Sequence, residues 1–480
     1  MSFGRGLARD SLIYGGADLV TKAVAFFSFP LLATALSPRD YGSLELIMTL
    51  IGVAGLVVGC GLNNSVQRFY WDSSVSVGQR PSLVTTGMVV QSFFGLMLFL
   101  CLAAVLFCWG NALVSAKDFP FSLGGLYVAA ALVVFGQLMQ YIQDVLRLHF
   151  APGRFFLLAV LSRCLTIAAA VYAVVYLHKG LDGFLVAQLM AYVLFLPVGL
   201  LLVKKDLVFN FDVERAREII RFGYPFVFAG VAYWLFGAID RWMLAGLATL
   251  EEAGIYSVAF RFSTLPLFVS IAFAQAWSPF IIKIKSDHPE SYKAIYCNVF
   301  LYFLYAMLIA AGGVALFSGE LIGFLMPSGY AGAAIPLIFL CFSVVIQSTT
   351  QITVIGISIE RKTHYISRFA WIAVAINVLL NFLLIPSFGA VGAAISMGLS
   401  YLSLTIMYGL TTQKIHPLPL AFRPLSVLSV LGGVVLMASL LLHSAEFNWS
   451  IVSIKIMLAL VCMTLGAFAL PWSRKIWKFQ

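Results

Sequence analysis

The chain has 480 residues, of which 61% are hydrophobic and only 10% are charged, and its formal net charge is +10. Soluble domains carry about 25% charged residues, so the composition excludes a soluble globular protein and predicts an all-α polytopic membrane protein. The positive charge is then expected to set the topology and to attract lipid headgroups, and we do not expect nucleic acid binding.

Apolar runs recur along the whole chain, and each is long enough to cross a bilayer as a helix, which takes about 20 residues. They indicate about fourteen transmembrane helices, at residues 12–36, 42–65, 82–109, 123–143, 155–177, 181–203, 225–247, 254–282, 295–318, 333–357, 367–386, 389–410, 424–443 and 450–470. The first run is too long for a signal-peptide core and lacks a cleavage-like end, so we expect it to be retained.

Lysine and arginine are concentrated in alternate connections between these runs. The other connections hold only Arg39, Lys117 and Lys179. Because short loops rich in lysine and arginine stay in the cytoplasm, the pattern predicts that both termini are cytoplasmic. Only an even number of helices keeps this alternation, so the count and the orientation support each other.

The longest polar connection, residues 204–223, is expected to hold an amphipathic helix on the cytoplasmic surface. It divides the chain into an N-lobe of six helices at 1–203 and a C-lobe of six helices at 224–412, followed by a helix hairpin at 413–480. Short motifs recur at matching places in the two lobes. Asp40 and Glu252 each stand two residues before a glycine, and Gly180 matches Gly389. These matches predict two lobes related by a parallel pseudo-repeat.

Five basic residues fall at membrane depth: Lys22, Arg163, Arg241, Arg261 and Lys455. A charge at the centre of a bilayer costs about 2.5 to 3.5 kcal/mol even on lenient scales, so such residues normally face protein or water. Arg241 and Arg261 flank one short turn at a similar depth, which indicates a polar cavity. Lys455 is near a helix end, and we expect it to extend to the membrane surface.

Three acidic residues lie at or near membrane depth: Asp18, Glu45 and Asp240. Asp18 and Lys22 are four residues apart, so they share a helix face as a stabilising pair would. Asp240 directly precedes a basic residue, Arg241. We expect these carboxylates to balance the basic charges, and the alternative is that one of them carries a coupling proton or sodium ion.

Three segments resemble one known group of transporters. They are LSPRDYGSLELIMTL at 36–50, DRWMLAGLATLEEAGIYSVAFRF at 240–262 and NFLLIPSFGAVGAAIS at 381–396. In order and spacing they are similar to the polysaccharide-transport branch of the multidrug/oligosaccharidyl-lipid/polysaccharide (MOP) superfamily, which includes flippases of O-antigen and exopolysaccharide repeat units. The likeness spans essentially the whole chain.

The resemblance implies a flippase that moves an undecaprenyl-pyrophosphate-linked oligosaccharide from the inner to the outer leaflet of a bacterial plasma membrane. It implies alternating access around a cationic cavity, with no cofactor, metal or catalytic residue. Its substrate contacts are expected at Arg241, Arg261, Lys22 and Arg68. The expected partners are the lipid-linked oligosaccharide, membrane lipid and other membrane proteins of polysaccharide assembly.

Depth in the membrane groups the basic residues into two pairs. Lys22 and Arg163 fall about 12 to 15 Å from the cytoplasmic face, whereas Arg241 and Arg261 fall about 10 Å from the outer one. Guanidinium groups bind phosphate oxygens bidentately and keep their proton. We therefore predict a ladder of charges, in which an inward-open state exposes the first pair and closure passes the head group to the second.

Two other functions are compatible with parts of the sequence. An ion-coupled exporter of drugs or small metabolites from the same superfamily is expected to have an apolar cavity with lone carboxylates, whereas here the membrane-depth bases at least equal the acids. A membrane enzyme of glycan assembly usually has a large outer loop or a soluble domain. The outer loops here are short, and no nucleotide-binding, zinc-protease or triad motif is found, so we do not expect an enzyme.

Overall fold

The computed structural model describes residues 2–72, 75–115, 120–208, 210–287, 289–360, 362, 364–444 and 448–470. Within these ranges, side chains are described except at 2–14, 18, 229, 233, 275–276, 278–280, 282–283 and 285–286. The described chain is helical and holds no β-strand. The predicted all-α fold class is confirmed.

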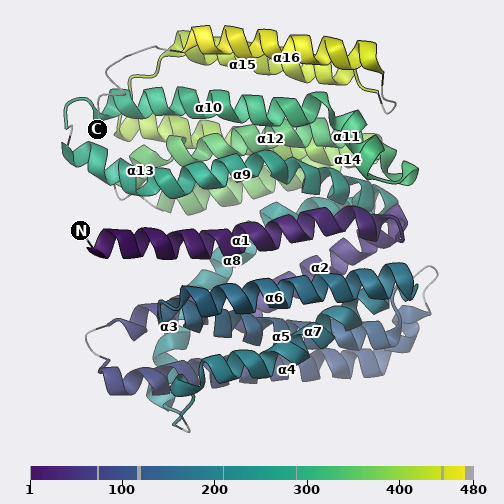
Figure 1. The fold of residues 1–480 in the computed structure, drawn as a ribbon, viewed down its shortest axis with the longest axis vertical. Helices are drawn as coiled ribbons and strands as arrows, with labels where there is room; N and C mark the ends of the chain where they lie inside the picture. Colours follow the sequence, from purple (N-terminus) through teal and green to yellow (C-terminus); the bar gives the residue numbers. More distant parts are fainter. Residues whose placement is uncertain are drawn as a thin grey trace. The chain divides into compact units, whose positions relative to one another are not determined.

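Contacts divide the chain into two compact units, Met1–Trp234 and Leu235–Gln480. In the first unit α4, α5, α6 and α7 lie alongside one another in Figure 1. The described part of this unit holds eight α-helices. They are α1 (Ser2–Ala33), α2 (Pro38–Gly59), α3 (Leu62–Tyr70), α4 (Arg80–Val114), α5 (Leu123–Leu148), α6 (Pro152–Val171), α7 (Gly180–Leu202) and the first part of α8 (Val213–Leu247).

The second unit holds the rest of α8 and the remaining helices. They are α9 (Leu250–Asp287), α10 (Tyr292–Leu316), α11 (Ser318–Leu325), α12 (Ala334–Thr353), α13 (Ile355–Ile359), α14 (His364–Ile415), α15 (Phe422–Leu441) and α16 (Trp449–Ala469). The last two pack against each other and along α10, as Figure 1 shows. They form the hairpin that the sequence predicts after the second lobe.

The spanning helices correspond to the fourteen predicted apolar runs. In the described residues twelve helices are long and apolar enough to cross a membrane, and α8 is a thirteenth if its two parts, bent by 42°, count as one span. Helix α14 is one of the twelve although it covers two predicted runs, 367–386 and 389–410. The backbone leaves the helical conformation at Gly389, and the Tyr408 hydroxyl donates to the Ile366 carbonyl at 3.2 Å. Helix α14 therefore consists of two helices that fold back on each other, as the two runs predict.

The connection at 204–223 is only partly a linker. Its helical part is the beginning of α8, which runs from Val213 into the next apolar run without a loop. Ala216 and Ile219, two apolar residues of this segment, are buried in the core of the first unit together with residues of α4 and α5. These residues therefore pack against protein, and α8 continues from the first unit into the second.

The matching motifs of the two lobes form the same local structure. The Ser37 hydroxyl accepts a hydrogen bond from the Asp40 N–H at 3.1 Å at the start of α2. At the start of α9 the Thr249 hydroxyl accepts one from the Glu252 N–H, also at 3.1 Å. In both lobes the motif is thus a helix N-cap with an acidic residue three positions later.

The matching glycines also agree, because both lie in the left-handed region that favours glycine. Gly180 has φ 57° and Gly389 has φ 52°. In the second lobe the Ala390 N–H donates to Glu252 Oε2 at 2.7 Å, so the helix-capping carboxylate of α9 also holds the N-terminus of the second part of α14. The two motifs that mark the repeat are therefore in contact in this lobe.

Replacing Gly389 by alanine is expected to destabilise the protein by about 1 to 3 kcal/mol, because an L-residue is strained at this φ. The added Cβ would also lie 2.5 Å from Glu252 Oε2. Thermal unfolding of the purified protein in detergent measures the effect. Gly313→Ala is the matched control, since a Cβ there meets nothing within 4 Å and alanine favours a helix. Equal unfolding temperatures for both variants would contradict the prediction.

Candidate functional site

A pocket of about 310 Å³ lies within the first unit, between α1, α5, α6 and α7. Lys22 of α1, Arg147 of α5 and Arg163 of α6 line it, together with hydroxyl and amide side chains that include Gln140 and Ser162. No acidic side chain is among the described residues that line it. We call it the cationic pocket, and its composition suits an anion with several charges.

The three basic residues reach this pocket from different helices. Lys22 and Arg163 are exposed in the structure. The Arg147 guanidinium lies over the Phe155 ring at 4.5 Å and also donates to Asp144 Oδ1 at 3.1 Å. Asp144 and Arg147 therefore form the ion pair that their i, i+3 spacing favours, and Phe155 fixes the orientation of the guanidinium.

A second pocket of about 490 Å³ adjoins the first, between α3, α5 and the turn after α5. Asn63, Asn64, Gln67 and Trp71 line one side of it. Gln140 and Arg147 line both this pocket and the cationic pocket. We call it the amide pocket. Its amide residues and Trp71 were missed in the sequence. Gln137, Gln140 and Gln143 recur every three residues within an apolar run, which is a signal for a polar helix face, and Gln140 of this face lines the pocket.

A buried polar cluster lies in the second unit around Asp240. Its carboxylate accepts hydrogen bonds from the Tyr256 hydroxyl and from the Asn381 amide, both at 2.6 Å. Tyr256 comes from α9 and Asn381 from α14, so the carboxylate joins three helices. All three residues are buried. The Tyr256 hydroxyl is therefore engaged in this cluster.

Arg241 is directed from α8 towards α9. Its guanidinium donates to the Ser257 hydroxyl at 3.1 Å and to the Gly237 carbonyl at 2.8 Å, and it lies 4.5 Å from the centre of the Phe260 ring. The residue is only 7% exposed. Arg261, on α9, is half-buried. Neither residue lines the cationic pocket or the amide pocket.

The remaining predicted residues lie elsewhere in the first unit. Arg68 is exposed on α3, with its guanidinium 5.0 Å from the centre of the Phe222 ring. Glu45 accepts a hydrogen bond from the Tyr41 hydroxyl at 2.7 Å. The Asp18 side chain lies outside the described residues. Of the predicted basic residues, the structure thus places Lys22 and Arg163 in one pocket and the others outside it.

The expectation for Lys455 was wrong. This residue is fully buried, and its ammonium donates to both carboxylate oxygens of Glu320, at 2.6 and 2.8 Å. Glu320 belongs to α11, a short helix in a stretch that the sequence indicates as a connection. Lys455 does not extend to the membrane surface because this partner lies against it.

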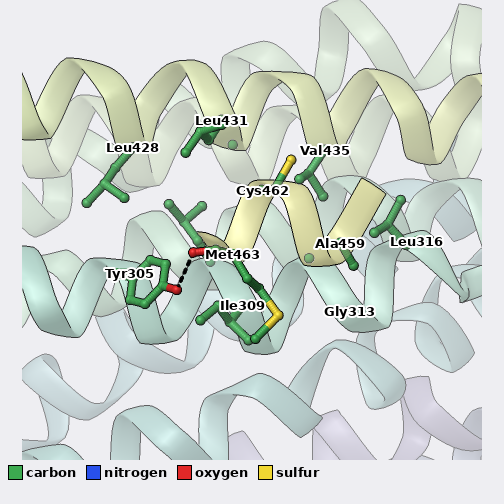
Figure 2. Close-up of a pocket in the computed structure, with 13 residues that line it drawn as sticks. Tyr305, Ile309, Gly313, Leu316, Leu428, Leu431, Val435, Ala459, Cys462 and Met463 are labelled. Atoms are coloured by element: carbon green, nitrogen blue, oxygen red, sulfur yellow. Dashed lines mark hydrogen bonds between the residues drawn. The ribbon is translucent and has the colours of Figure 1, made fainter. Parts of the chain in front are cut away.

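An apolar pocket of about 180 Å³ lies between α10, α15 and α16, and Figure 2 shows the side chains around it. Most of them are aliphatic, and they include Leu316, Leu428 and Val435. The Tyr305 hydroxyl is turned to the Met463 carbonyl and donates a hydrogen bond of 2.6 Å to it. The pocket therefore offers hydrocarbon contacts rather than polar ones.

Comparison with known sequences gives a consistent set of matches. A family model described as polysaccharide biosynthesis protein matches residues 7–285. The probable low-salt glycan biosynthesis flippase Agl15 of Haloferax volcanii is 22% identical over 408 residues, which cover 84% of this chain and 82% of that protein. The succinoglycan biosynthesis transport protein ExoT of Rhizobium meliloti is 24% identical over 249 residues, which cover 51% of this chain and 47% of that protein.

Solved structures share the fold. The lipid II flippase MurJ in its inward closed conformation matches with a TM-score of 0.71 and 13% identity, over 95% of this chain and 98% of that one. An inward-facing multidrug resistance transporter of the MATE family, in the MOP superfamily, matches with a TM-score of 0.61 and 15% identity, over 82% of this chain and 94% of that one. At these identities the likeness establishes the fold.

Proposed function

We propose that this chain, which belongs to the polysaccharide biosynthesis protein family, moves an undecaprenyl-pyrophosphate-linked oligosaccharide from the inner to the outer leaflet. It is a multi-pass membrane flippase of the MOP superfamily and not an enzyme. The membrane would be a bacterial plasma membrane, with both termini in the cytoplasm. Relatives whose names describe glycan biosynthesis flippase and transport proteins support a glycan as the cargo.

The cationic pocket is the observation that carries this proposal. Three basic side chains and no described acidic one line a space between transmembrane helices. Holding such charges at membrane depth is costly unless water or an anion accompanies them. A pyrophosphate carries several negative charges and many acceptor oxygens, which Lys22, Arg147 and Arg163 would bind by charge-assisted hydrogen bonds. The prenyl tail would remain among apolar side chains or lipid.

Transfer across the membrane would follow the ladder of charges. The pyrophosphate would bind first in the cationic pocket and then at Arg241 and Arg261. This transfer needs a state in which Arg241, held here by Ser257 and the Gly237 carbonyl, turns to the substrate. Asp240 accepts two hydrogen bonds and precedes Arg241 in the chain, which favours a role in charge balance over the coupling of a proton or sodium ion.

The test is deletion of the gene in its own organism, followed by mass spectrometry of lipid-linked intermediates in each membrane leaflet. We expect the intact lipid-linked oligosaccharide to accumulate in the inner leaflet and to return to normal when the wild-type gene is restored. If the deletion instead raises sensitivity to cationic drugs and leaves the lipid-linked pool unchanged, the multidrug exporter is the correct function and the proposal is rejected.

A further inference from the structure

We propose that the amide pocket binds the sugar that is attached directly to the pyrophosphate, and that this sugar is an uncharged pyranose. The inference rests on the proposed function, because it assigns the pyrophosphate to the cationic pocket. It adds a second binding site, with its own ligand class, next to the first.

The amide pocket presents the groups that recognise carbohydrate hydroxyls. Each side-chain amide of Asn63, Asn64, Gln67 and Gln140 offers both a donor and an acceptor, as a sugar hydroxyl requires. The Asn63 Oδ1 atom is buried and has no hydrogen-bond partner within the described part of the chain. A buried carbonyl oxygen without a partner costs free energy, and a hydroxyl donor from a bound sugar would remove that cost.

Trp71 gives the pocket an aromatic surface. Its side chain is 51% exposed, although its ring is held in place by the Arg80 guanidinium at 4.7 Å and by the Phe150 ring at 5.7 Å. A pyranose ring has apolar C–H faces that pack well on an exposed indole ring, because this contact removes apolar area from water. Since neighbours already fix the ring, little further freedom is lost when a sugar binds.

The charge of the pocket selects a neutral sugar. Its two charged residues are Asp144 and Arg147, and they are paired with each other at 3.1 Å. Gln140 also donates to both Asp144 oxygens, at 3.2 and 3.4 Å. The Asp144 carboxylate is therefore satisfied, and the described lining carries no net charge. A sugar carboxylate would have to compete with Asp144 for the Arg147 guanidinium and would be repelled by Asp144.

The arrangement of the two pockets matches the chemistry of the substrate. Gln140 and Arg147 line both of them, so a ligand in one lies next to a ligand in the other. In a lipid-linked oligosaccharide the pyrophosphate is bonded directly to the first sugar. A cationic pocket beside a neutral pocket of amides and indole is thus complementary to a pyrophosphate that carries an uncharged sugar.

Binding to the full-length protein in lipid nanodiscs, measured by calorimetry, tests this inference. The probes are farnesyl pyrophosphate and its conjugates with glucose, galactose, N-acetylglucosamine or glucuronic acid. We expect at least one neutral conjugate to bind about tenfold tighter than farnesyl pyrophosphate, as a few hydrogen bonds and a stacking contact would give. The glucuronic acid conjugate is expected to bind no tighter than farnesyl pyrophosphate.

Variants of the amide pocket should abolish the tighter binding of the neutral conjugate and leave the binding of farnesyl pyrophosphate itself nearly unchanged. Trp71→Ala and Asn64→Ala are expected to bind the neutral conjugate no tighter than farnesyl pyrophosphate, and to bind farnesyl pyrophosphate itself within about twofold of wild type. Trp109→Ala and Asn111→Ala, at exposed positions of α4, are the matched controls and should keep the gain. Arg163→Gln, in the cationic pocket, should weaken every probe.

Each outcome decides between the two proposals. If wild type binds farnesyl pyrophosphate but no neutral conjugate binds tighter, or if the gain survives in the Trp71 and Asn64 variants, the sugar site is rejected and the proposed function stands. If the glucuronic acid conjugate binds tighter than farnesyl pyrophosphate, the proposal that the sugar is uncharged is rejected. If wild type binds none of the probes, the pyrophosphate site fails and the sugar site falls with it.

Discussion

Replacing Lys22 and Arg163 together by glutamine is expected to reduce transport of the lipid-linked oligosaccharide by about 100-fold or more. Two hydrogen bonds to charged groups contribute about 1.5 to 3 kcal/mol each, and both would be lost from the cationic pocket. The two residues come from α1 and α6, and both are exposed. Transport is measured as the rate at which the labelled substrate becomes accessible outside reconstituted vesicles.

The matched control removes two basic charges elsewhere in the first unit. Arg154 is exposed on the same helix as Arg163, and Lys205 is exposed in the connection before α8, and neither lines the cationic pocket. The Arg154→Gln, Lys205→Gln protein should transport normally. Charge-preserving exchanges, Lys22→Arg and Arg163→Lys, should keep most of the activity. Normal transport by the Lys22→Gln, Arg163→Gln protein at a normal folded level would reject the cationic pocket as the substrate site.

Replacing Glu320 by leucine is expected to destabilise the second unit by about 3 to 5 kcal/mol, because it leaves the buried Lys455 ammonium without a carboxylate. Lys455 is 0% exposed and Glu320 is 11% exposed, so water cannot replace the lost partner. The pair joins α16 to α11. The His443 imidazole nearby does not carry a second charge at neutral pH, because its burial and then the Lys455 charge lower its pKa.

A double replacement separates loss of the pair from loss of the charge. The Glu320→Leu, Lys455→Met protein buries no charge, and replacing a buried ion pair by apolar residues is often neutral or stabilising. We expect its unfolding temperature in detergent to return close to that of wild type, whereas Glu320→Leu alone unfolds at a clearly lower temperature. If both proteins are equally unstable, the charge of Lys455 is not the cause.

Local chemistry made much of the fold predictable. The N-cap at Ser37 and its counterpart at Thr249 depend on a hydroxyl and a backbone N–H three residues later, so the motif itself contains both partners. The positive φ of Gly180 and Gly389 likewise depends on the absence of a side chain at that residue. The turn inside α14 was predictable in the same way, because Pro386 and Gly389 are residues expected between two helices.

The candidate site was predictable only in part. Depth along a helix groups Lys22 with Arg163, and the structure places both at one pocket. Depth does not give the direction of a side chain around the helix axis. Arg241 is directed to Ser257 on the next helix and is buried, although its depth in the membrane suggested a place in an open cavity. The amide pocket combines residues of α3 and α5, which are far apart in the chain.

The sequence by itself determined that the chain is an all-helical membrane protein with these apolar spans, because hydropathy and helix capping depend on residues within one helix or turn. Tertiary structure alone decided which charges from different helices are paired and which face a pocket. Lys455 is the clearest case, since its position near a helix end suggested solvation at the membrane surface, and Glu320 from another helix keeps it buried. The free energy of a charge in a membrane protein depends on the groups around it, and packing between helices brings those groups together.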